Sequence, residues 1–390
     1  MKVFKKRKLI SLILSLLFLG FFSYRKINSR VSHRFPASSN IMQPAVELGE
    51  VWTSEDRTNS DEITQIIGNA LEQRTAGVTL MKRDAHPKHH GCLKAFFQID
   101  SHQLPLEQQV GVFSKENQKE FLAWIRFSNG DPDSTKADAD GDVRGMAIKL
   151  MNVNNSASGS QDFLLMNSKT FFIKDSAEYL DLMQSIDSTI SLGWFFLTHS
   201  HDRQILLAAR GMKVGNPLDV NYFSATPYKL GGTTMKFSAK PCLINRTPEG
   251  VSKNPTHNFL RENLVKSIGK SEACFDFFIQ RNTSPETMPI ENPTVEWSEV
   301  KSPFIKVATI HIPIQSGSDS EELMNYCENL SFDPWHTLPE QRPLGAINRI
   351  RLQAYSEISK KRHLHNRIPQ IEPRNHEACN RETQELCQNR

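Results

Sequence analysis

The sequence predicts an α+β protein whose core is an antiparallel β-sheet or β-barrel. From residue 93 onward, apolar residues form short runs or alternate with polar residues, as they do in half-buried strands. Pro and Gly fall between these runs, where turns require them. The runs do not alternate regularly with helical patterns, which argues against a Rossmann fold. The expected strands cover residues 93–99, 121–127, 146–151, 162–166, 235–243, 274–280 and 304–314.

Helical patterns flank and interrupt these strands. Asp61 is expected to cap an amphipathic helix that carries Ile63 and Ile67 on one face. A second helix is expected at about 176–187, and a third follows the last strand and contains Tyr355.

The chain of 390 residues divides into four parts. Residues 1–24 combine a basic start with an apolar run over 9–22, which is typical of a signal peptide or an N-terminal membrane anchor. More cations precede this run than follow it, so we expect an exported protein, periplasmic or extracellular, with membrane association through 9–22 left open. Residues 25–60 are expected to be a linker, 61–370 the folded domain and 371–390 a polar, disordered tail.

Charge and cysteine content limit the class of partner. Residues 1–30 hold eight Lys and Arg and no acidic residue, whereas the whole chain has a net charge of +4, so the remainder is net −4. A body without a basic surplus argues against nucleic acid as a partner. Six cysteines show no C-x-x-C spacing, and Cys379 and Cys387 fit free thiols as well as a disulfide in an oxidising compartment.

Fixed cations flank one tyrosine of the third helix. Arg351 lies one turn before Tyr355, and Arg362 lies two turns after it on the same face. A guanidinium stays charged and favours the phenolate over the phenol, and tyrosinate is one of the side chains that ligate haem iron. By itself, this spacing is more typical of an exposed helix contact.

The pattern resembles the proximal helix of haem catalases, where Arg-x-x-x-Tyr supplies the axial tyrosinate. The resemblance implies that Tyr355 ligates the iron of haem b, beside Arg351, and that Arg362 binds a haem propionate. It also implies the haem catalase fold, an antiparallel β-barrel with an N-terminal arm and a proximal helix for the haem ligand. Four segments in the expected order, within about 61–370, carry the resemblance.

The upstream segment 83–92 resembles the distal Arg-x-Val-His segment of catalases. The resemblance puts His86 above the iron, where a neutral imidazole takes the first proton of a peroxide and returns it to the leaving oxygen. It puts Arg83 on a propionate. Ala85 stands where catalases carry Val, which should widen the approach to the haem.

Three histidines within five residues of this segment also suggest a zinc cluster. They would converge only on a helix, and Pro87 with Gly91 disfavours a helix. Zinc is therefore not expected, and His89 and His90 are expected in a solvated loop.

The segment 124–128 resembles the Val-Arg-Phe-Ser strand of catalases, and alternation places Arg126 and Ser128 on one face. The resemblance assigns Arg126 to a propionate and Ser128 to the orientation of the distal histidine. The segment 142–150 resembles an adjoining strand and is expected to be structural.

The segment 162–175 departs from the catalase pattern. In ungapped register, Met166 replaces the catalytic distal Asn, and Asn167 reaches the site only if the loop shifts by one residue. The expected site still includes Asn167 as a catalytic residue. Tyr179 occupies the place of an aromatic residue that stacks on haem.

We therefore expect a haem peroxidase or catalase-like oxidoreductase that cleaves peroxide O–O bonds. Ala85 and Met166 weaken the case for rapid dismutation of hydrogen peroxide and favour a small-molecule or lipid co-substrate. Two alternatives stay open: an enzyme that rearranges lipid hydroperoxides, similar to catalase-fold allene oxide synthases, and a non-enzymatic exported haem-binding protein. A homo-oligomer also stays open.

Overall fold

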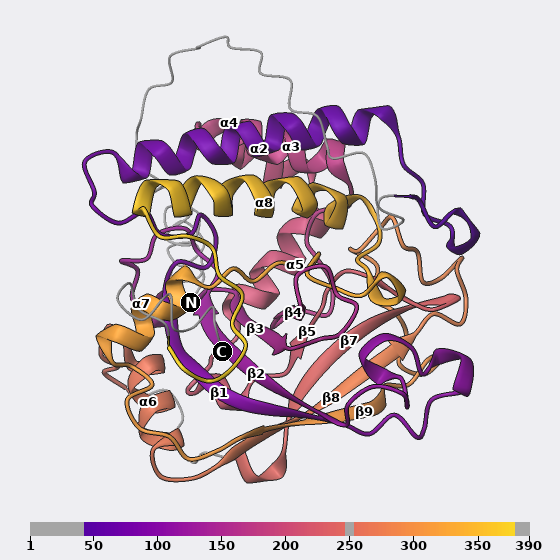
Figure 1. The fold of residues 1–390 in the computed structure, drawn as a ribbon. Coiled ribbons are helices and arrows are strands. Elements are labelled where there is room, and N and C mark those ends of the chain that lie inside the picture. Colours follow the sequence, from indigo (N-terminus) through magenta and orange to yellow (C-terminus); the bar gives the residue numbers. More distant parts are fainter. Residues whose placement is uncertain (1–42, 246–252, 379–390) are drawn as a thin grey trace, which may run out of the picture.

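A closed antiparallel barrel forms the centre of the computed structural model, which describes residues 43–245 and 253–378. The strand order is β5-β4-β3-β2-β1-β9-β8-β7-β6, and β5 also pairs with β7. This pairing closes eight strands into a ring and leaves β6 attached to β7, so the predicted α+β barrel is confirmed (Figure 1). The strands are β1 (His89–Ile99), β2 (Glu120–Asn129), β3 (Arg144–Met151), β4 (Ser160–Met166), β5 (Tyr222–Phe223), β6 (Tyr228–Leu230), β7 (Thr233–Pro241), β8 (Ala273–Arg281) and β9 (Ile305–Ile312).

Aromatic rings fill the barrel. Phe277 of β8 packs against Phe163 of β4, with ring centroids 4.9 Å apart, and against Phe97 of β1 at 5.1 Å. Phe163 also meets Phe237 of β7 edge to face at 5.1 Å. These side chains are buried because alternation along each strand turns every second residue inward.

The helices gather around the barrel, and the long α2 and α8 lie side by side at one end of it (Figure 1). Ile63 and Ile67 of α2 pack against Ile350 and Ala354 of α8 in a second hydrophobic core. This layer holds the Tyr355 helix over the open end of the barrel. The helices are α2 (Ser54–Thr75), α3 (Ser176–Ser185), α4 (Thr189–Thr198), α5 (Ser200–Gly211), α6 (Phe259–Ile268), α7 (Glu321–Asn329) and α8 (Ala346–Asn366), and short 3-10 turns cover Val46–Leu48, Leu106–Gln108, Gly111–Phe113, Asp138–Asp140, Pro217–Asp219, Leu243–Asn245 and Pro339–Gln341.

The N-terminal helix begins earlier than predicted. Thr53, not Asp61, caps α2: its Oγ1 accepts a hydrogen bond from Asp56 N at 3.1 Å, and Asp56 accepts one from Thr53 N at 3.1 Å. This reciprocal capping box fixes the helix start, so residues 54–60 are helix rather than linker.

Part of the predicted tail also packs on the barrel. Glu372 pairs with the buried Lys149 at 2.7 Å, and the carbonyl of Asn375 accepts from Trp124 Nε1 at 3.2 Å. The expectation of a disordered tail is therefore wrong for residues 371–378. The rest of the tail, with Cys379 and Cys387, lies outside the described residues, as does the 9–22 run. Within 43–245 and 253–378, no helix is long and apolar enough to cross a bilayer.

Candidate active site

A cavity of about 1050 Å³ lies among β2, β3, β4, α3, α4 and α8. Arg83, His86, Arg126, Ser128, Tyr179, Arg351, Tyr355 and Arg362 all line it. Eight of the nine predicted site residues are therefore brought together from segments far apart in the sequence. The exception is Asn167.

His86 is held in a defined orientation at the barrel end. Its backbone adopts a left-handed conformation with φ of 62°, and its N–H donates to the carbonyl of Gly130 at 3.3 Å. Its Nδ1 lies 3.0 Å from Ser128 Oγ, so the predicted pairing of these two side chains is present in the structure. A left-handed non-glycine residue is uncommon, and such strain concentrates at functional sites.

The imidazole of His86 is neutral at physiological pH. Burial, together with the charges of Arg126, Arg351 and Arg83, lowers its pKa to about 3. A neutral ring can accept a proton at once, as an acid–base catalyst requires.

Tyr355 lies on α8, and Arg351 lies one turn before it as predicted. Burial raises the pKa of the phenol more than Arg351 and Arg83 lower it, while Asp333 raises it further. Arg351 therefore shifts the pKa of Tyr355 in the predicted direction, but burial outweighs it. A buried phenol releases its proton when a metal ion binds the oxygen, because the ion's charge replaces the proton.

Aromatic and polar neighbours hold Arg351 beside Tyr355. Its guanidinium lies 5.4 Å from the ring centre of Phe171 and donates to Asn348 Oδ1 at 3.2 Å. Phe171 in turn meets Tyr179 edge to face at 6.4 Å. These contacts form an aromatic wall of the cavity between α3 and α8.

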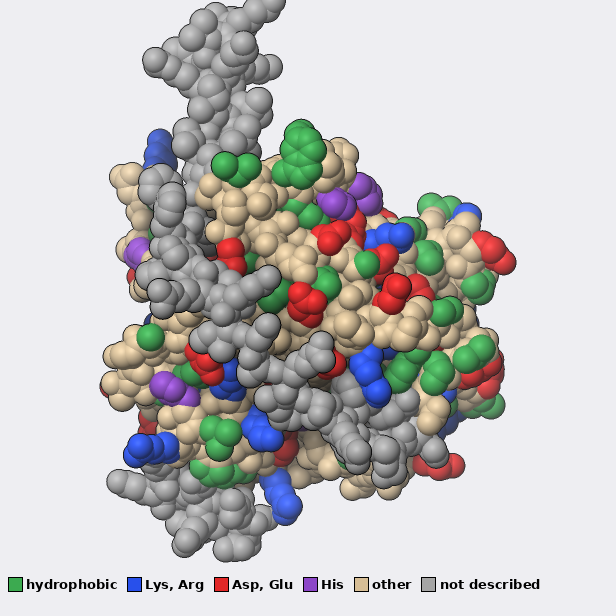
Figure 2. All heavy atoms as spheres, turned by 90° about the horizontal axis from the view of Figure 1, so that it is seen from above, with side chains coloured by type: hydrophobic (Ala, Val, Ile, Leu, Met, Phe, Trp, Pro, Cys, Tyr) green, Lys and Arg blue, Asp and Glu red, His purple; other side chains and the backbone are tan. Residues whose placement is uncertain are grey.

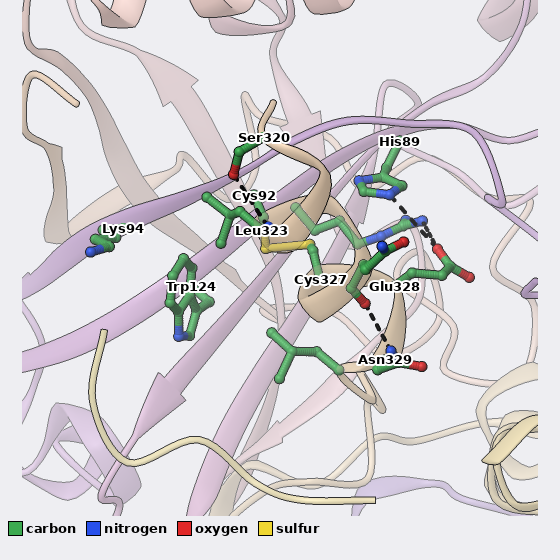
Figure 3. Close-up of a disulfide and its surroundings, with 12 residues drawn as sticks. His89, Cys92, Lys94, Trp124, Ser320, Leu323, Cys327, Glu328 and Asn329 are labelled. Carbon is green, nitrogen blue, oxygen red and sulfur yellow. Dashed lines mark hydrogen bonds and ion pairs between the residues drawn. A yellow bond between two sulfur atoms is a disulfide. The ribbon is translucent and has the colours of Figure 1, made fainter. Parts of the chain in front are cut away.

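The three arginines predicted to bind propionates converge on Glu328, which the sequence did not identify. Glu328 lies in the last turn of α7. Its carboxylate accepts from the backbone N of Arg83 at 3.0 Å and from Arg126 Nη2 at 3.3 Å, while its carbonyl accepts from Arg362 Nη1. Burial raises the pKa of Glu328, but the three arginines together lower it below its ordinary value. Figure 3 shows Glu328 next to Cys327, whose disulfide with Cys92 joins α7 to β1.

One carboxylate facing three guanidiniums leaves two positive charges uncompensated. Burial lowers the pKa of Arg126 and of Arg362 to about 9, because their charges are costly to desolvate. Among the described residues, the buried Nε of Arg126 has no hydrogen-bond partner, and that of Arg83 makes only a 3.6 Å ion-pair contact with Glu328 Oε1. The cluster is therefore incomplete and suits a ligand with two negative charges.

His89 and His90 are buried residues of β1, so the expectation of a solvated loop is wrong. His90 Nε2 lies 2.8 Å from Asn129 Oδ1, and His89 Nε2 lies 3.9 Å from Glu328. Burial lowers both pKa values, that of His90 to about 4, so both rings are neutral. No metal-ligand cluster of His, Cys, Asp and Glu occurs within the part of the chain that the structure describes.

Met166, not Asn167, lines the cavity. The Asn167 side chain is buried elsewhere: its Oδ1 accepts from Arg144 N at 2.8 Å, and its Nδ2 donates to the carbonyl of Ala209 at 2.9 Å. These bonds tie β3 to α5, so Asn167 is a structural residue and its predicted place in the catalytic site is wrong. Ala85 does line the cavity, as expected.

Known proteins with a similar fold include two solved catalases. The fold is similar to that of a fungal catalase, with a TM-score of 0.58 and 20% identity over 74% of this chain and 61% of the other. The fold is also similar to that of catalase A from Saccharomyces cerevisiae, with a TM-score of 0.59 and 18% identity over 75% of this chain and 65% of the other. The sequence model of the catalase family matches residues 78–193. The chain therefore has the fold of these catalases, and its residues 78–193 are similar in sequence to the catalase family. It spans less than two thirds of either solved catalase, and no curated protein matches it.

The residues that border the cavity fit a haem group. The cavity lies at the upper end of the usual volume range for cofactor sites. A phenol on α8, a neutral imidazole at the barrel end and an unsatisfied dicationic cluster all border it. An iron ligand, a distal acid–base group and partners for two carboxylates are therefore available together.

Proposed function

We propose that this chain binds haem b and acts as a catalase-like haem peroxidase that cleaves peroxide O–O bonds. The observation that carries the proposal is one cavity bordered by the His86–Ser128 pair and by Tyr355 with Arg351. A haem carrier would need only Tyr355 and the arginines. A neutral histidine held by a serine beside the same cavity favours an enzyme.

Tyr355 would ligate the haem iron, and the cluster around Glu328 would hold the propionates through Arg83, Arg126 and Arg362. When bound, the haem supplies the redox centre for peroxide cleavage. Arg351 would compensate the negative charge of the tyrosinate, since no proton remains on that oxygen. Tyr179 would border the cofactor on α3.

His86 would move the proton. In the tautomer that carries hydrogen on Nδ1, this nitrogen donates to Ser128 Oγ and leaves the Nε2 lone pair free. Nε2 accepts the proton from the near oxygen of the peroxide and then donates it to the far oxygen, which leaves as water or as an alcohol. The low pKa keeps the ring ready to accept that proton across physiological pH.

Met166 and Ala85 favour organic molecules over a second hydrogen peroxide. A thioether offers no N–H to hold a peroxide, and the cavity walls include the apolar side chains of Leu164, Leu192 and Phe196. An organic hydroperoxide or an organic electron donor suits such walls. The same observation keeps the rearrangement of a lipid hydroperoxide as the second candidate reaction.

We further propose an oxidising compartment for this protein. Cys92–Cys327 and Cys242–Cys274 form disulfides, and the described residues include no free cysteine. Disulfides persist mainly in exported proteins, which agrees with the basic and apolar start of the chain.

The function is tested by comparing oxygen release from hydrogen peroxide with oxidation of an organic donor. His86→Ala should lower both rates about 100-fold or more at unchanged haem content, because only proton transfer is lost. Met166→Asn should raise oxygen release relative to donor oxidation. Unchanged turnover in His86→Ala would refute the enzyme, and oxygen release already exceeding donor oxidation in the wild type would refute the peroxidase assignment.

A further inference from the structure

Helix α4 exposes large apolar side chains on its outer face. Ile190 is 83% exposed, Trp194 67% and Leu197 61%, and their spacing of four and three residues places them on one side of the helix. Leu192 and Phe195 are buried on the other side. A surface helix ordinarily turns polar residues outward, so α4 departs from the usual pattern.

The outer face of α4 is also free of charge. No Asp, Glu, Lys or Arg occurs between residues 188 and 200. The polar groups at the helix end are satisfied locally, since Thr198 Oγ1 donates to the carbonyl of Trp194 at 3.1 Å and the His199 ring stacks on Phe195 at 4.2 Å. Removing this face from water therefore requires little loss of hydration.

The inner face of α4 reaches the cavity. Leu192 and Phe196 line it together with Leu206 of α5. The helix thus separates the cavity from an apolar surface by a layer of apolar side chains. Figure 2 views the molecule from the side of the helical layer, and hydrophobic side chains project at its edge.

Helix α2, near the start of the described chain, belongs to the same layer as α4. Helix α2 packs on α3 and α3 on α4, and Asn59 near the start of α2 donates to Ser176 at the start of α3 at 3.1 Å. Residues 23–42 separate the apolar run over 9–22 from residue 43, the first described residue. Twenty residues reach at most about 70 Å, so a membrane that holds 9–22 lies within that distance of residue 43.

We propose that the outer face of α4 docks on a neutral lipid bilayer, with Ile190, Trp194 and Leu197 inserted at the level of the headgroups and upper acyl chains. The aromatic and aliphatic face without charge suits zwitterionic lipid. Docking depends on no cofactor. A consequence of docking is that an apolar hydroperoxide passes from the bilayer to the cavity beside Leu192 and Phe196. Only this consequence rests on the proposed function.

The test uses the full chain with phosphatidylcholine vesicles whose acyl chains are brominated. The signal is the part of the tryptophan emission that disappears in Trp194→Phe, because the chain has five tryptophans. Bromine should quench this part by half or more in the wild type. The double variant Ile190→Ser with Leu197→Ser should lose the quenching even where the N-terminal segment still tethers the chain.

Leu106→Ser with Leu243→Ser is the matched control, since both leucines are more than 70% exposed away from α4, and it should keep the quenching. Unquenched Trp194 on vesicle-bound protein would overturn the proposal. So would a stable dimer in lipid-free solution that Ile190→Ser with Leu197→Ser converts to monomer, because the face would then be covered by a second copy. These outcomes are independent of haem binding and of turnover.

Discussion

At the scale of single residues, Gly145 decides whether His86 and Ser128 can meet. Gly145 of β3 is the cross-strand neighbour of Ser128 in β2. A methyl group on its Cα would lie 2.7 Å from the His86 ring and 2.9 Å from Ser128 Oγ, closer than real carbon atoms approach. The glycine therefore provides the space that holds the imidazole in place.

Gly145→Ala should displace the His86 ring while leaving Tyr355 untouched on α8. Misplacement of a catalytic group by about 1 Å can cost about 100-fold in rate, so peroxide turnover should fall to that extent at normal haem content. The measurement is turnover per bound haem. Gly232→Ala is the control, because nothing lies within 4 Å of its added methyl group. Equal turnover in both variants would show that His86 does not act from its observed position.

Residue patterns predicted most of the site, but they missed Glu328 and included Asn167. The Arg–Tyr spacing and the His86 and Ser128 segments identified both sides of the cavity. Glu328 was not predicted because a glutamate on a helix gives no sequence signal, and its three arginine neighbours come from distant segments of the chain. Asn167 was misplaced because chain order does not reveal which of two adjacent side chains turns toward the cavity.

At the scale of elements, the disulfide Cys92–Cys327 holds the end of α7 against β1. It joins residues 235 apart, whereas Cys242–Cys274 joins residues 32 apart. Glu328 follows Cys327 directly, so the disulfide also fixes the carboxylate that organises Arg83 and Arg126. One covalent link thus supports both the fold and the charged cluster.

The loss of chain entropy in the unfolded state predicts how much each disulfide stabilises the fold. Replacing Cys92 and Cys327 by Ser should lower the free energy of unfolding by up to roughly 5 kcal/mol, and replacing Cys242 and Cys274 should lower it by roughly 4 kcal/mol. Only the first pair should also weaken haem binding, because only it supports Glu328. Denaturant titration and haem affinity measure the two effects. Equal haem affinity in the two double variants would show that the Cys92–Cys327 disulfide does not support haem binding.

The elements differ in how far sequence predicts them. The predicted strands overlap seven of the nine strands because alternation is a strong signal, and β5 and β6 are too short to show it. Helix α4 was missed because it is apolar on both faces, which removes the amphipathic period. The start of α2 was missed because polar residues fill its first turns.

At the scale of the whole molecule, buried neutral histidines link folding to pH. Burial lowers the pKa of His90 and of His363 to about 4, and that of His86 to about 3, whereas unfolded histidine titrates near 6.5. Below pH 6.5 the unfolded chain therefore binds more protons than the folded chain, and stability falls as the pH falls. Asp202 and Asp333, whose pKa values burial raises to about 6, oppose this trend in part.

The free energy of unfolding without haem should therefore be lower at pH 5 than at pH 7. His363→Gln removes one such group and should reduce the slope by up to about 1.4 kcal/mol per pH unit. Urea titrations of both proteins at several pH values measure this difference. Parallel pH profiles for wild type and His363→Gln would mean that His363 is protonated in the folded state.

The proposed haem site depends most on Tyr355 as the iron ligand. The direct measurement is the absorption spectrum of the full chain with haem b, for wild type, Tyr355→Phe and the control Tyr326→Phe, whose phenol lies on α7 outside the cavity. We expect the wild type and Tyr326→Phe to share a tyrosinate-type haem spectrum and Tyr355→Phe to lose it. The same spectrum in Tyr355→Phe would contradict the assignment of the ligand and, with it, the proposed architecture of the site.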